Sequence, residues 1–221
     1  MMKKIKNIIR DLYYRTKIDK KVRLQWLGSE YGGWFVCPDL VKDDSIVYSF
    51  GIGDDISFDV GIINKFDCNV RGYDPTPVSL EFLKNAQKGK KFIINEVGLS
   101  YYDGLETFFL PQPGNVSCSV VKKDESTESV DLKVMKLSTI MRENNHSSID
   151  LLKMDIEGGE IKVLDNIIEE QINIKQILVE YHPKVLTKSL VNQSVNRLKK
   201  YGYKVVSIRH GKEYTFVHVD H

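Results

Sequence analysis

Residues 149–160 read IDLLKMDIEGGE, and they carry the clearest structural signal in the chain. The first half is a short apolar run without alternation, which is typical of a strand covered on both faces in a parallel sheet. Asp155, Glu157 and two glycines follow, and from Ile161 the apolar residues recur at helical spacing. The stretch therefore predicts a strand, an acidic turn and a helix in direct succession. Open α/β sheets bind ligands at this end of a strand.

A second strand, turn and helix are predicted near residues 46–63. The apolar residues 46–50 run into a turn with two glycines and two acids, residues 51–55, of which either acid can cap the helix that follows. Glycine lets a backbone approach a ligand closely, and a helix amino end offers free N–H groups. A dinucleotide fingerprint would need glycine where Ile56 stands, and the acids would repel a pyrophosphate. The turn therefore disfavours NAD.

The next predicted strand, residues 69–73, ends in Asp74. A carboxylate about twenty residues beyond a glycine turn is placed to accept hydrogen bonds from both ribose hydroxyls of a nucleoside cofactor. The alternative is a turn or cap residue, because Thr76 and Pro77 begin the next helix. Both interpretations of Asp74 stay open at this point.

The rest of the chain predicts alternating elements followed by a terminal hairpin. The expected strands are residues 91–99, the β pieces 105–110, 116–121 and 130–137, and then 175–180, 204–208 and 214–219. The expected helices are residues 78–86, 139–143 with Ser138 as cap, 159–170 and 187–200.

The turn after residue 154, Asp155 to Glu160, resembles the signature of the FkbM-type family of S-adenosylmethionine (SAM) dependent methyltransferases. In that signature a buried strand ends in D-[IV]-E-G-[AG]-E, and every position matches. Residues 49–59 are similar to a subgroup reading S-F-G-I-G-x-D-x-S-F-[DE], although Ser49 and Asp55 depart from the general pattern [DE]-x-G-x-G-x-G. The resemblance runs from about Tyr31 to Tyr181. It implies a Rossmann-like class I methyltransferase fold, an α/β fold with a mostly parallel sheet, helices on both faces and, from the pattern at its end, a C-terminal antiparallel hairpin.

The resemblance also implies SAM as cofactor, and the acidic turn suits its cationic sulfonium and ammonium groups. The region after residue 95 would border the adenine. The residues predicted to contact the cofactor are Ser49, Gly51, Gly53, Asp55, Asp74, Glu96, Val97 and Asp155.

Methyl transfer is a direct displacement in which the acceptor oxygen, methyl carbon and sulfur must lie in line and the acceptor must lose a proton. Asp155, Glu157 and His182 are the predicted catalytic residues, with His182 and one of the two carboxylates as candidate bases. His182 can instead simply orient a loop, and Glu160 can merely favour the first helical turn. The same three residues could bind a divalent ion, but they lack a fixed ligand spacing, so no metal site is predicted.

Residues 31–35 read Tyr-Gly-Gly-Trp-Phe. Such a segment can close over a flat ligand, because glycine allows close approach and the rings supply stacking area. An ordinary β-turn with a buried Trp34 explains it equally well.

The chain has 221 residues with 42% hydrophobic content, which indicates one well-buried domain. Its formal charge of +2 gives no reason to expect a nucleic-acid partner. Nine Lys or Arg against two Asp fall in residues 1–24, where apolar spacing predicts a basic amphipathic helix. That helix packs on the domain or a second subunit, or touches a membrane surface reversibly.

Three widely spaced cysteines, Cys37, Cys68 and Cys118, fit a reduced compartment and exclude a C-x-x-C site. No run approaches the roughly 18 apolar residues of a membrane span, and the charged start is no signal peptide, so a cytoplasmic protein without stable membrane insertion is expected.

The resulting prediction has residues 1–27 as helix and lead-in and residues 28–221 as a SAM-dependent methyltransferase domain with a β insertion at about 103–137. Its expected reaction is O-methylation of a hydroxyl on a saccharide or another small molecule. One alternative is a nicotinamide-dependent oxidoreductase or epimerase, disfavoured by Ile56 and by the lack of a Tyr-x-x-x-Lys pair after the fourth strand. Another is a SAM-binding protein without catalysis that docks on a membrane or partner.

Overall fold

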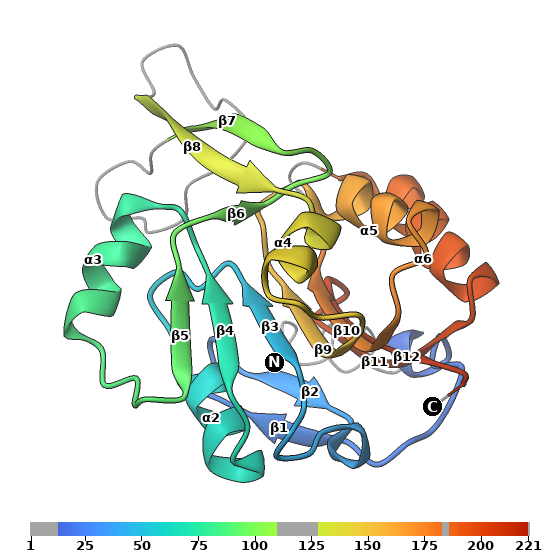
Figure 1. Cartoon of the computed structure of the whole chain (residues 1–221). Helices are drawn as coiled ribbons and strands as arrows, with labels where there is room; N and C mark the ends of the chain where they lie inside the picture. The colour runs from blue at the N-terminus through green and yellow to red at the C-terminus, as the bar shows by residue number, and fades with distance from the viewer. Residues whose placement is uncertain (1–12, 110–127, 183–185, 221) are drawn as a thin grey trace, which may run out of the picture.

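The computed structural model describes residues 13–109, 128–182 and 186–220 (Figure 1). Most of the predicted amphipathic helix lies outside the described residues, as does the predicted strand 116–121. The described part of the chain forms a central sheet, a small hairpin of β1 (Gln25–Leu27) and β2 (Trp34–Val36), and a separate three-stranded sheet.

The central sheet has seven strands in the order β11-β12-β10-β9-β3-β4-β5. Its strands are β3 (Val47–Phe50), β4 (Val70–Tyr73), β5 (Phe92–Asn95), β9 (Ile149–Met154), β10 (Ile174–Glu180), β11 (Tyr203–Arg209) and β12 (Glu213–His218). The strands from β10 to β5 pair in parallel, whereas β12 pairs antiparallel with both β10 and β11. The mostly parallel sheet and the C-terminal antiparallel hairpin confirm the predicted fold class.

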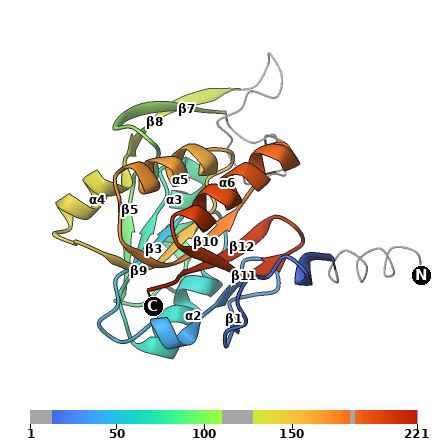
Figure 2. The same ribbon diagram turned by 90° about the vertical axis from the view of Figure 1, so that its right-hand side faces the viewer.

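Both faces of this sheet are covered, with α5 and α6 on one side and α2 on the other (Figure 2). On β9, Leu152 packs in a core cluster with residues of α4, α5 and α6, while the adjacent Leu151 packs with α2 and the β1–β2 hairpin. Both leucines are fully buried, which explains why this strand shows no polar alternation. The helices are η1 (Pro38–Leu40), α2 (Ser57–Phe66), α3 (Pro77–Asn85), α4 (Leu137–Glu143), α5 (Glu160–Glu169) and α6 (Lys188–Lys200).

The single strand predicted at residues 91–99 is wrong. β5 ends at Asn95, and β6 (Gly98–Leu99) leaves the central sheet to pair with β8 (Ser129–Met135). The last bond of this ladder runs from the Asp74 N–H to the Asn95 carbonyl; the next donor on that side, the Thr76 N–H, bonds to the Asp74 carboxylate instead, and Thr76 caps α3, so the pairing ends. β8 also pairs with β7 (Gly104–Phe109), so the predicted β pieces 105–110 and 130–137 are strands, while their assignment to an insertion stays a prediction.

Two predicted helix starts have different outcomes. Thr76 caps α3 as expected, because its side chain accepts a hydrogen bond from the N–H of Ser79. Ser138 does not cap α4, which begins at Leu137, two residues before the predicted start, with Lys136 at the N-cap position. The carboxylate of Asp103, from the β insertion, instead accepts hydrogen bonds from the Lys136 N–H and the Thr139 hydroxyl.

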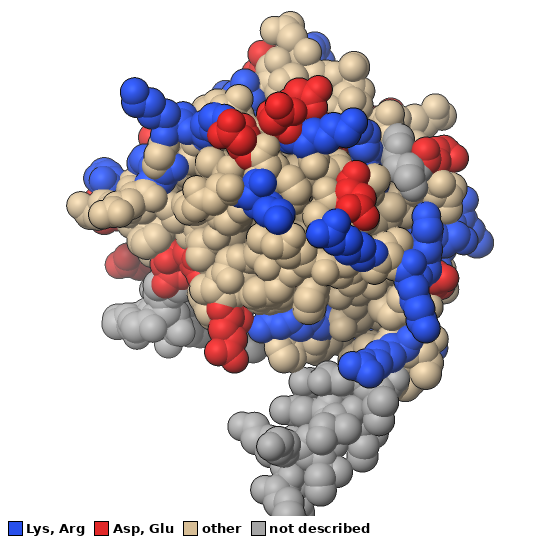
Figure 3. Space-filling model, turned by 90° about the horizontal axis from the view of Figure 1, so that it is seen from below, with Lys and Arg blue, Asp and Glu red and all other residues tan. Residues whose placement is uncertain are grey.

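On the face shown in Figure 3, acidic and uncharged residues separate the lysines and arginines. In the described ranges, no helix combines the length and apolarity needed to cross a bilayer.

Candidate active site

The carboxyl ends of β3, β9 and β10 lie side by side. Parallel pairing sets Phe50 opposite Met154, and Met154 opposite Val179, so the residues that follow each strand emerge at one edge of the sheet. Asp155 directly follows β9, and His182 lies two residues beyond β10. This edge is where the sequence predicted the chemistry.

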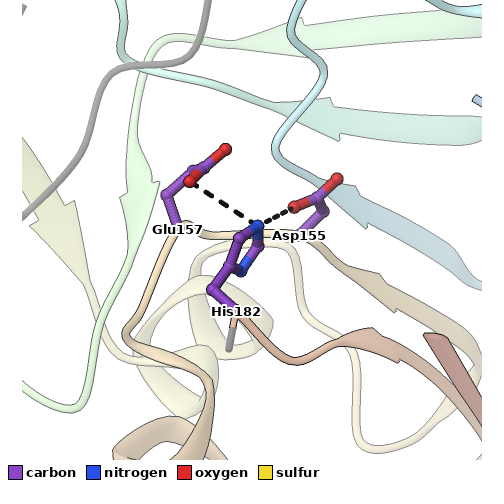
Figure 4. A group of neighbouring side chains, drawn as sticks. All are labelled: Asp155, Glu157 and His182. Atoms are coloured by element: carbon purple, nitrogen blue, oxygen red, sulfur yellow. Dashed lines mark ion pairs between the residues drawn. The ribbon is translucent and has the colours of Figure 1, made fainter. Parts of the chain in front are cut away.

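Asp155, Glu157 and His182 converge on a common centre (Figure 4). The Nε2 atom of His182 lies 3.4 Å from Oδ1 of Asp155 and 3.5 Å from Oε2 of Glu157. The exposed fractions of the three side chains are 31%, 33% and 15%, respectively, so a ligand can reach them. The structure thus brings together all three residues that were predicted to be catalytic.

Glu160 orients the imidazole of His182 through a hydrogen bond at Nδ1. Its side chain is wholly buried in the first turn of α5, and its Oε1 accepts hydrogen bonds from Nδ1 of His182 at 2.6 Å and from the Gly158 N–H at 2.9 Å. The other oxygen, Oε2, is buried without a hydrogen-bond partner among the described residues. Because Nδ1 is taken by Glu160, Nε2 faces the two partly exposed carboxylates of Asp155 and Glu157. Glu160 therefore does more than favour a helical turn.

The surrounding carboxylates keep His182 protonated at neutral pH. Burial alone would lower the pKa of the imidazole, but the hydrogen bond to Glu160 and the charges of Asp155 and Glu157 raise it to about 9. His182 can act as a base only when another positive charge at this edge lowers that pKa.

Asp155 and Glu180 extend the charged edge toward the C-terminal hairpin. Burial raises the pKa of the Asp155 carboxyl, and the positive charges of Lys153 and His182 oppose that rise. Glu180, the last residue of β10, forms an ion pair with Lys212 and lies 3.7 Å from Nε2 of His182. Carboxylates therefore dominate the surface that an acceptor or cation would meet.

The acidic turn has an unusual backbone at Glu157, whose φ of 52° lies in the left-handed region. A residue other than glycine, asparagine or aspartate is uncommon there, and such strain concentrates at functional sites. The next residue, Gly158, also has a positive φ, 119°. Together they place the Glu157 carboxylate beside the imidazole.

The glycine turn after β3 lies against the same edge. Gly51 has a φ of 75°, and a Cβ there would lie 1.7 Å from the carbonyl oxygen of Asp155. Gly53 has a φ of 60°, and a Cβ there would have no atom within 4 Å. Gly51 is therefore required by the neighbouring strand end, whereas Gly53 borders open space that a ligand can occupy.

Comparison with protein families matches residues 29–205 to the methyltransferase FkbM domain. The chain belongs to this family. It is 30% identical over 160 residues to the human "Probable methyltransferase-like protein 24", covering 67% of this chain and 38% of that protein, and 29% identical to the rat protein over the same shares. The chain thus spans well under half the length of these relatives.

Solved structures with a similar arrangement include a precorrin-6y C5,15-methyltransferase from Geobacter metallireducens, with a TM-score of 0.45 and 14% identity, covering 80% of this chain and 81% of that one. Another is a methyltransferase from Pyrococcus furiosus, with a TM-score of 0.43 and 9% identity over 99% of both chains.

The cofactor of this FkbM domain is S-adenosylmethionine, as family membership implies. The site fits that molecule, because the acidic edge complements a sulfonium cation and the open space at Gly53 lets the backbone approach it. Gly53 and Asp155 are the predicted cofactor residues that this geometry favours most directly.

Asp74 braces the glycine turn. Its Oδ2 accepts hydrogen bonds from the N–H groups of Ile52 and Gly53, and its Oδ1 accepts from the N–H and hydroxyl of Thr76. These four bonds use the approximately four acceptor positions of a carboxylate. Contact with a ribose, which stays a prediction, requires one of these donors to give way.

Ser49 is fully buried in the FkbM domain, so a side-chain contact between Ser49 and the cofactor has no support in this geometry.

On the same side of the sheet as Ser49 lie two groups that the sequence interpretation missed, Asp59 of α2 and Lys153 of β9. Lys153 is 7% exposed, and its ammonium donates hydrogen bonds to the carbonyls of Phe50 and Gly51. The sequence signal for this role was a lysine near the end of a mostly apolar strand, where its ammonium group can bond to the carbonyls of the neighbouring turn.

Asp55 links the segment at residues 28–33 to the start of α2, where it was predicted to cap the helix or contact cofactor. Its carboxylate accepts hydrogen bonds from the Ser29 hydroxyl and the Ser57 N–H, although the residue at the N-cap position is Ile56. Burial would raise the pKa of Asp55, but these hydrogen bonds lower it. Asp55 therefore serves the local structure, and a contact with the cofactor stays a prediction.

The aromatic segment, residues 31–35, agrees in part with each interpretation offered by the sequence: a buried tryptophan and an aromatic ring open to a ligand. Trp34 is buried, with 5% exposure, whereas Tyr31 is 73% exposed. Partial burial of the hydroxyl and the charges of Asp54 and Asp155 raise the pKa of Tyr31. Tyr31 is thus available to a bound molecule.

The two residues predicted to border the adenine lie in different surroundings. Glu96 is exposed, whereas Val97 is 8% exposed and packs in the core cluster. Both follow β5, so they lie at the same edge of the sheet as Asp74. Their contact with the cofactor stays a prediction.

Proposed function

We propose that this FkbM domain transfers the methyl group of SAM to a hydroxyl oxygen of a saccharide or another small molecule. The observation that carries the proposal is the convergence of Asp155, Glu157 and His182 beside the glycine turn. A partly open centre with two carboxylates and an imidazole can hold a hydroxyl group by hydrogen bonds and accept its proton.

Bound SAM supplies an electrophilic methyl group on a positively charged sulfur. In the proposed reaction the acceptor O–H bond breaks, a new O–C bond forms, and the electron pair of the S–C bond stays on sulfur. The products are a methyl ether, S-adenosylhomocysteine and one proton. Most of the acceleration would come from holding the acceptor in line, and a base adds roughly 10²–10⁴-fold.

The residues at the acidic edge of the sheet have different roles in this reaction, according to their charge. Asp155 and Glu157 accept hydrogen bonds from the acceptor hydroxyl. His182 becomes able to take the proton once a cation beside it lowers its pKa from about 9. Glu160 holds the imidazole with Nε2 toward the acceptor. The acceptor itself meets Tyr31 and the β insertion, which are the elements proposed to select it.

The test is formation of S-adenosylhomocysteine by the full chain in the presence of SAM and a panel of saccharides, with methyl-labelled SAM to locate the transferred group. Glu157→Gln should lower kcat by at least about tenfold. Glu143→Gln, the same change on the exposed end of α4, should leave it unchanged.

Label found on nitrogen or carbon instead of oxygen would overturn the proposal. Tight binding of SAM without any turnover would favour the alternative of a non-catalytic binding protein. Family membership leaves the nicotinamide alternative without support.

A further inference from the structure

We infer that Asp155, Glu157 and His182 bind a divalent metal ion, and that the open side of this ion receives the acceptor oxygen. The sequence led to the opposite expectation, because the three residues have no recognisable ligand spacing. The evidence for the ion site comes from the structure and does not depend on the proposed reaction. Its role toward the acceptor rests on the proposed methyl transfer.

The distances fit ligands around an ion better than a hydrogen-bonded cluster. Nε2 of His182 lies 3.4 Å from Asp155 and 3.5 Å from Glu157, which is too far for good hydrogen bonds. One ligand atom from each of the three side chains lies within 4.8 Å of the other two. With metal–ligand distances of about 2.0–2.2 Å, neighbouring ligand atoms lie roughly 3.0–3.6 Å apart. Small side-chain movements would bring all three atoms to one ion.

Glu160 supplies an independent indication. Imidazoles that bind metals through one nitrogen usually donate the other N–H to a carboxylate, which fixes the ring. His182 has this arrangement, with Nδ1 on Glu160 at 2.6 Å and Nε2 toward the partly exposed carboxylates of Asp155 and Glu157. Glu160 is wholly buried and its Oε2 has no hydrogen-bond partner in the described ranges. A buried carboxylate in this state is expensive unless positive charge lies nearby.

The charge balance also calls for a cation. Four carboxylates lie within 3.7 Å of the His182 ring nitrogens: those of Asp155, Glu157, Glu160 and Glu180. Lys212 is paired with Glu180, and the positive charge of Lys153 acts on Asp155. Of the two remaining negative charges, those of Glu157 and Glu160, a proton on His182 offsets one, whereas a divalent ion offsets both and leaves the imidazole neutral as a ligand.

The ligand set indicates the kind of ion. Carboxylates suit Mg²⁺ and Mn²⁺, while an imidazole favours transition metals, so Mn²⁺ satisfies both preferences. Three protein ligands leave coordination positions open on the exposed side. With Nε2 bound to the ion and Nδ1 on Glu160, His182 would no longer take the proton, and the ion would replace it. The ion would act as a Lewis acid toward an acceptor hydroxyl, which releases its proton to solvent while its electron pair attacks the methyl carbon.

The experiment is titration of the full chain with Mn²⁺ after treatment with a chelator, followed by electron paramagnetic resonance of free Mn²⁺ and by calorimetry. We expect one saturable site per chain. Glu157→Gln and Glu160→Gln should each weaken binding by roughly 10–100-fold. Glu143→Gln is the matched control and should bind like the wild type. Circular dichroism of each variant checks that it is folded.

Absence of saturable Mn²⁺ binding, or binding that is equal in the wild type and Glu157→Gln, would overturn the ion site. Titration with S-adenosylhomocysteine in chelator separates this outcome from failure of the proposed function. If the cofactor product binds and methylation proceeds in chelator, the ion inference fails while methyl transfer stands. If Mn²⁺ binds but no hydroxyl is methylated, the ion site stands and the proposed function fails.

Discussion

Replacement of Asp59 by asparagine should remove a loss in the free energy of unfolding that grows as the pH rises. Asp59 lies on α2 with 2% exposure, and its Oδ1 has no hydrogen-bond partner among the described residues. Burial raises the pKa of its carboxyl to about 6, although the positive charge of Lys153 opposes the rise. The ionised carboxylate is therefore less stable in the folded protein than in the unfolded chain.

The magnitude follows from the two pKa values, about 6 in the folded protein and 3.8 as the ordinary value. A difference of about two pH units corresponds to about 3 kcal/mol. Because the folded pKa is the higher one, the folded state binds more protons between these values. The contribution of Asp59 to stability is therefore complete below about pH 4 and is lost as the pH rises through about 6.

The assay is urea unfolding of the wild type and Asp59→Asn at several pH values from about 4 to about 7. The difference between their unfolding free energies isolates Asp59 from other titrating groups. It should change by roughly 2–2.5 kcal/mol in favour of the variant across this range, most of the full difference. Asp39→Asn, at an exposed residue paired with Arg23, should run parallel to the wild type. Parallel curves for Asp59→Asn would refute the reasoning.

Gly51→Ala should lower the free energy of unfolding by roughly 3 kcal/mol or more, because a Cβ would overlap the carbonyl oxygen of Asp155, 1.7 Å away. Gly53→Ala, also at positive φ but beside open space, should lower it by only about 1–2 kcal/mol; equal losses in thermal unfolding would contradict this account of the turn. In the metal-free protein, Glu160→Gln should move the pKa of His182 from about 9 toward its ordinary 6.5, because the strongest charge raising it is removed. Nuclear magnetic resonance titration of the ring protons measures this change, and an unaltered pKa would show that Glu160 does not hold the imidazole proton.

Local sequence patterns were sufficient for most elements of the sheet. The strand predicted at residues 149–154 coincides with β9, because an apolar run that is buried on both faces contains its own signal. The place of the candidate site followed from the same pattern, since parallel strands end at one edge of a sheet. The sequence was therefore sufficient to predict that Asp155, Glu157 and His182 belong to one site.

Contacts between distant segments could not be predicted in this way. The break after Asn95 depends on where the neighbouring strand turns away, which no pattern within residues 91–99 records. The buried position of Lys153 depends on carbonyls about a hundred residues earlier in the chain. The four hydrogen bonds of Asp74 likewise depend on how closely the glycine turn approaches β4.

The amino-acid sequence by itself determined the family, the α/β class and the identity of the residues at the acidic edge, because these rest on local periodicity and on a short contiguous signature. Only the tertiary structure decided what those residues do to one another. The pairing of Glu160 with His182 joins residues 22 positions apart, and its effect on the imidazole arises from burial and from charges on two separate strand ends. Burial and electrostatic interaction depend on distance in space, and that distance exists only once β9 and β10 lie side by side.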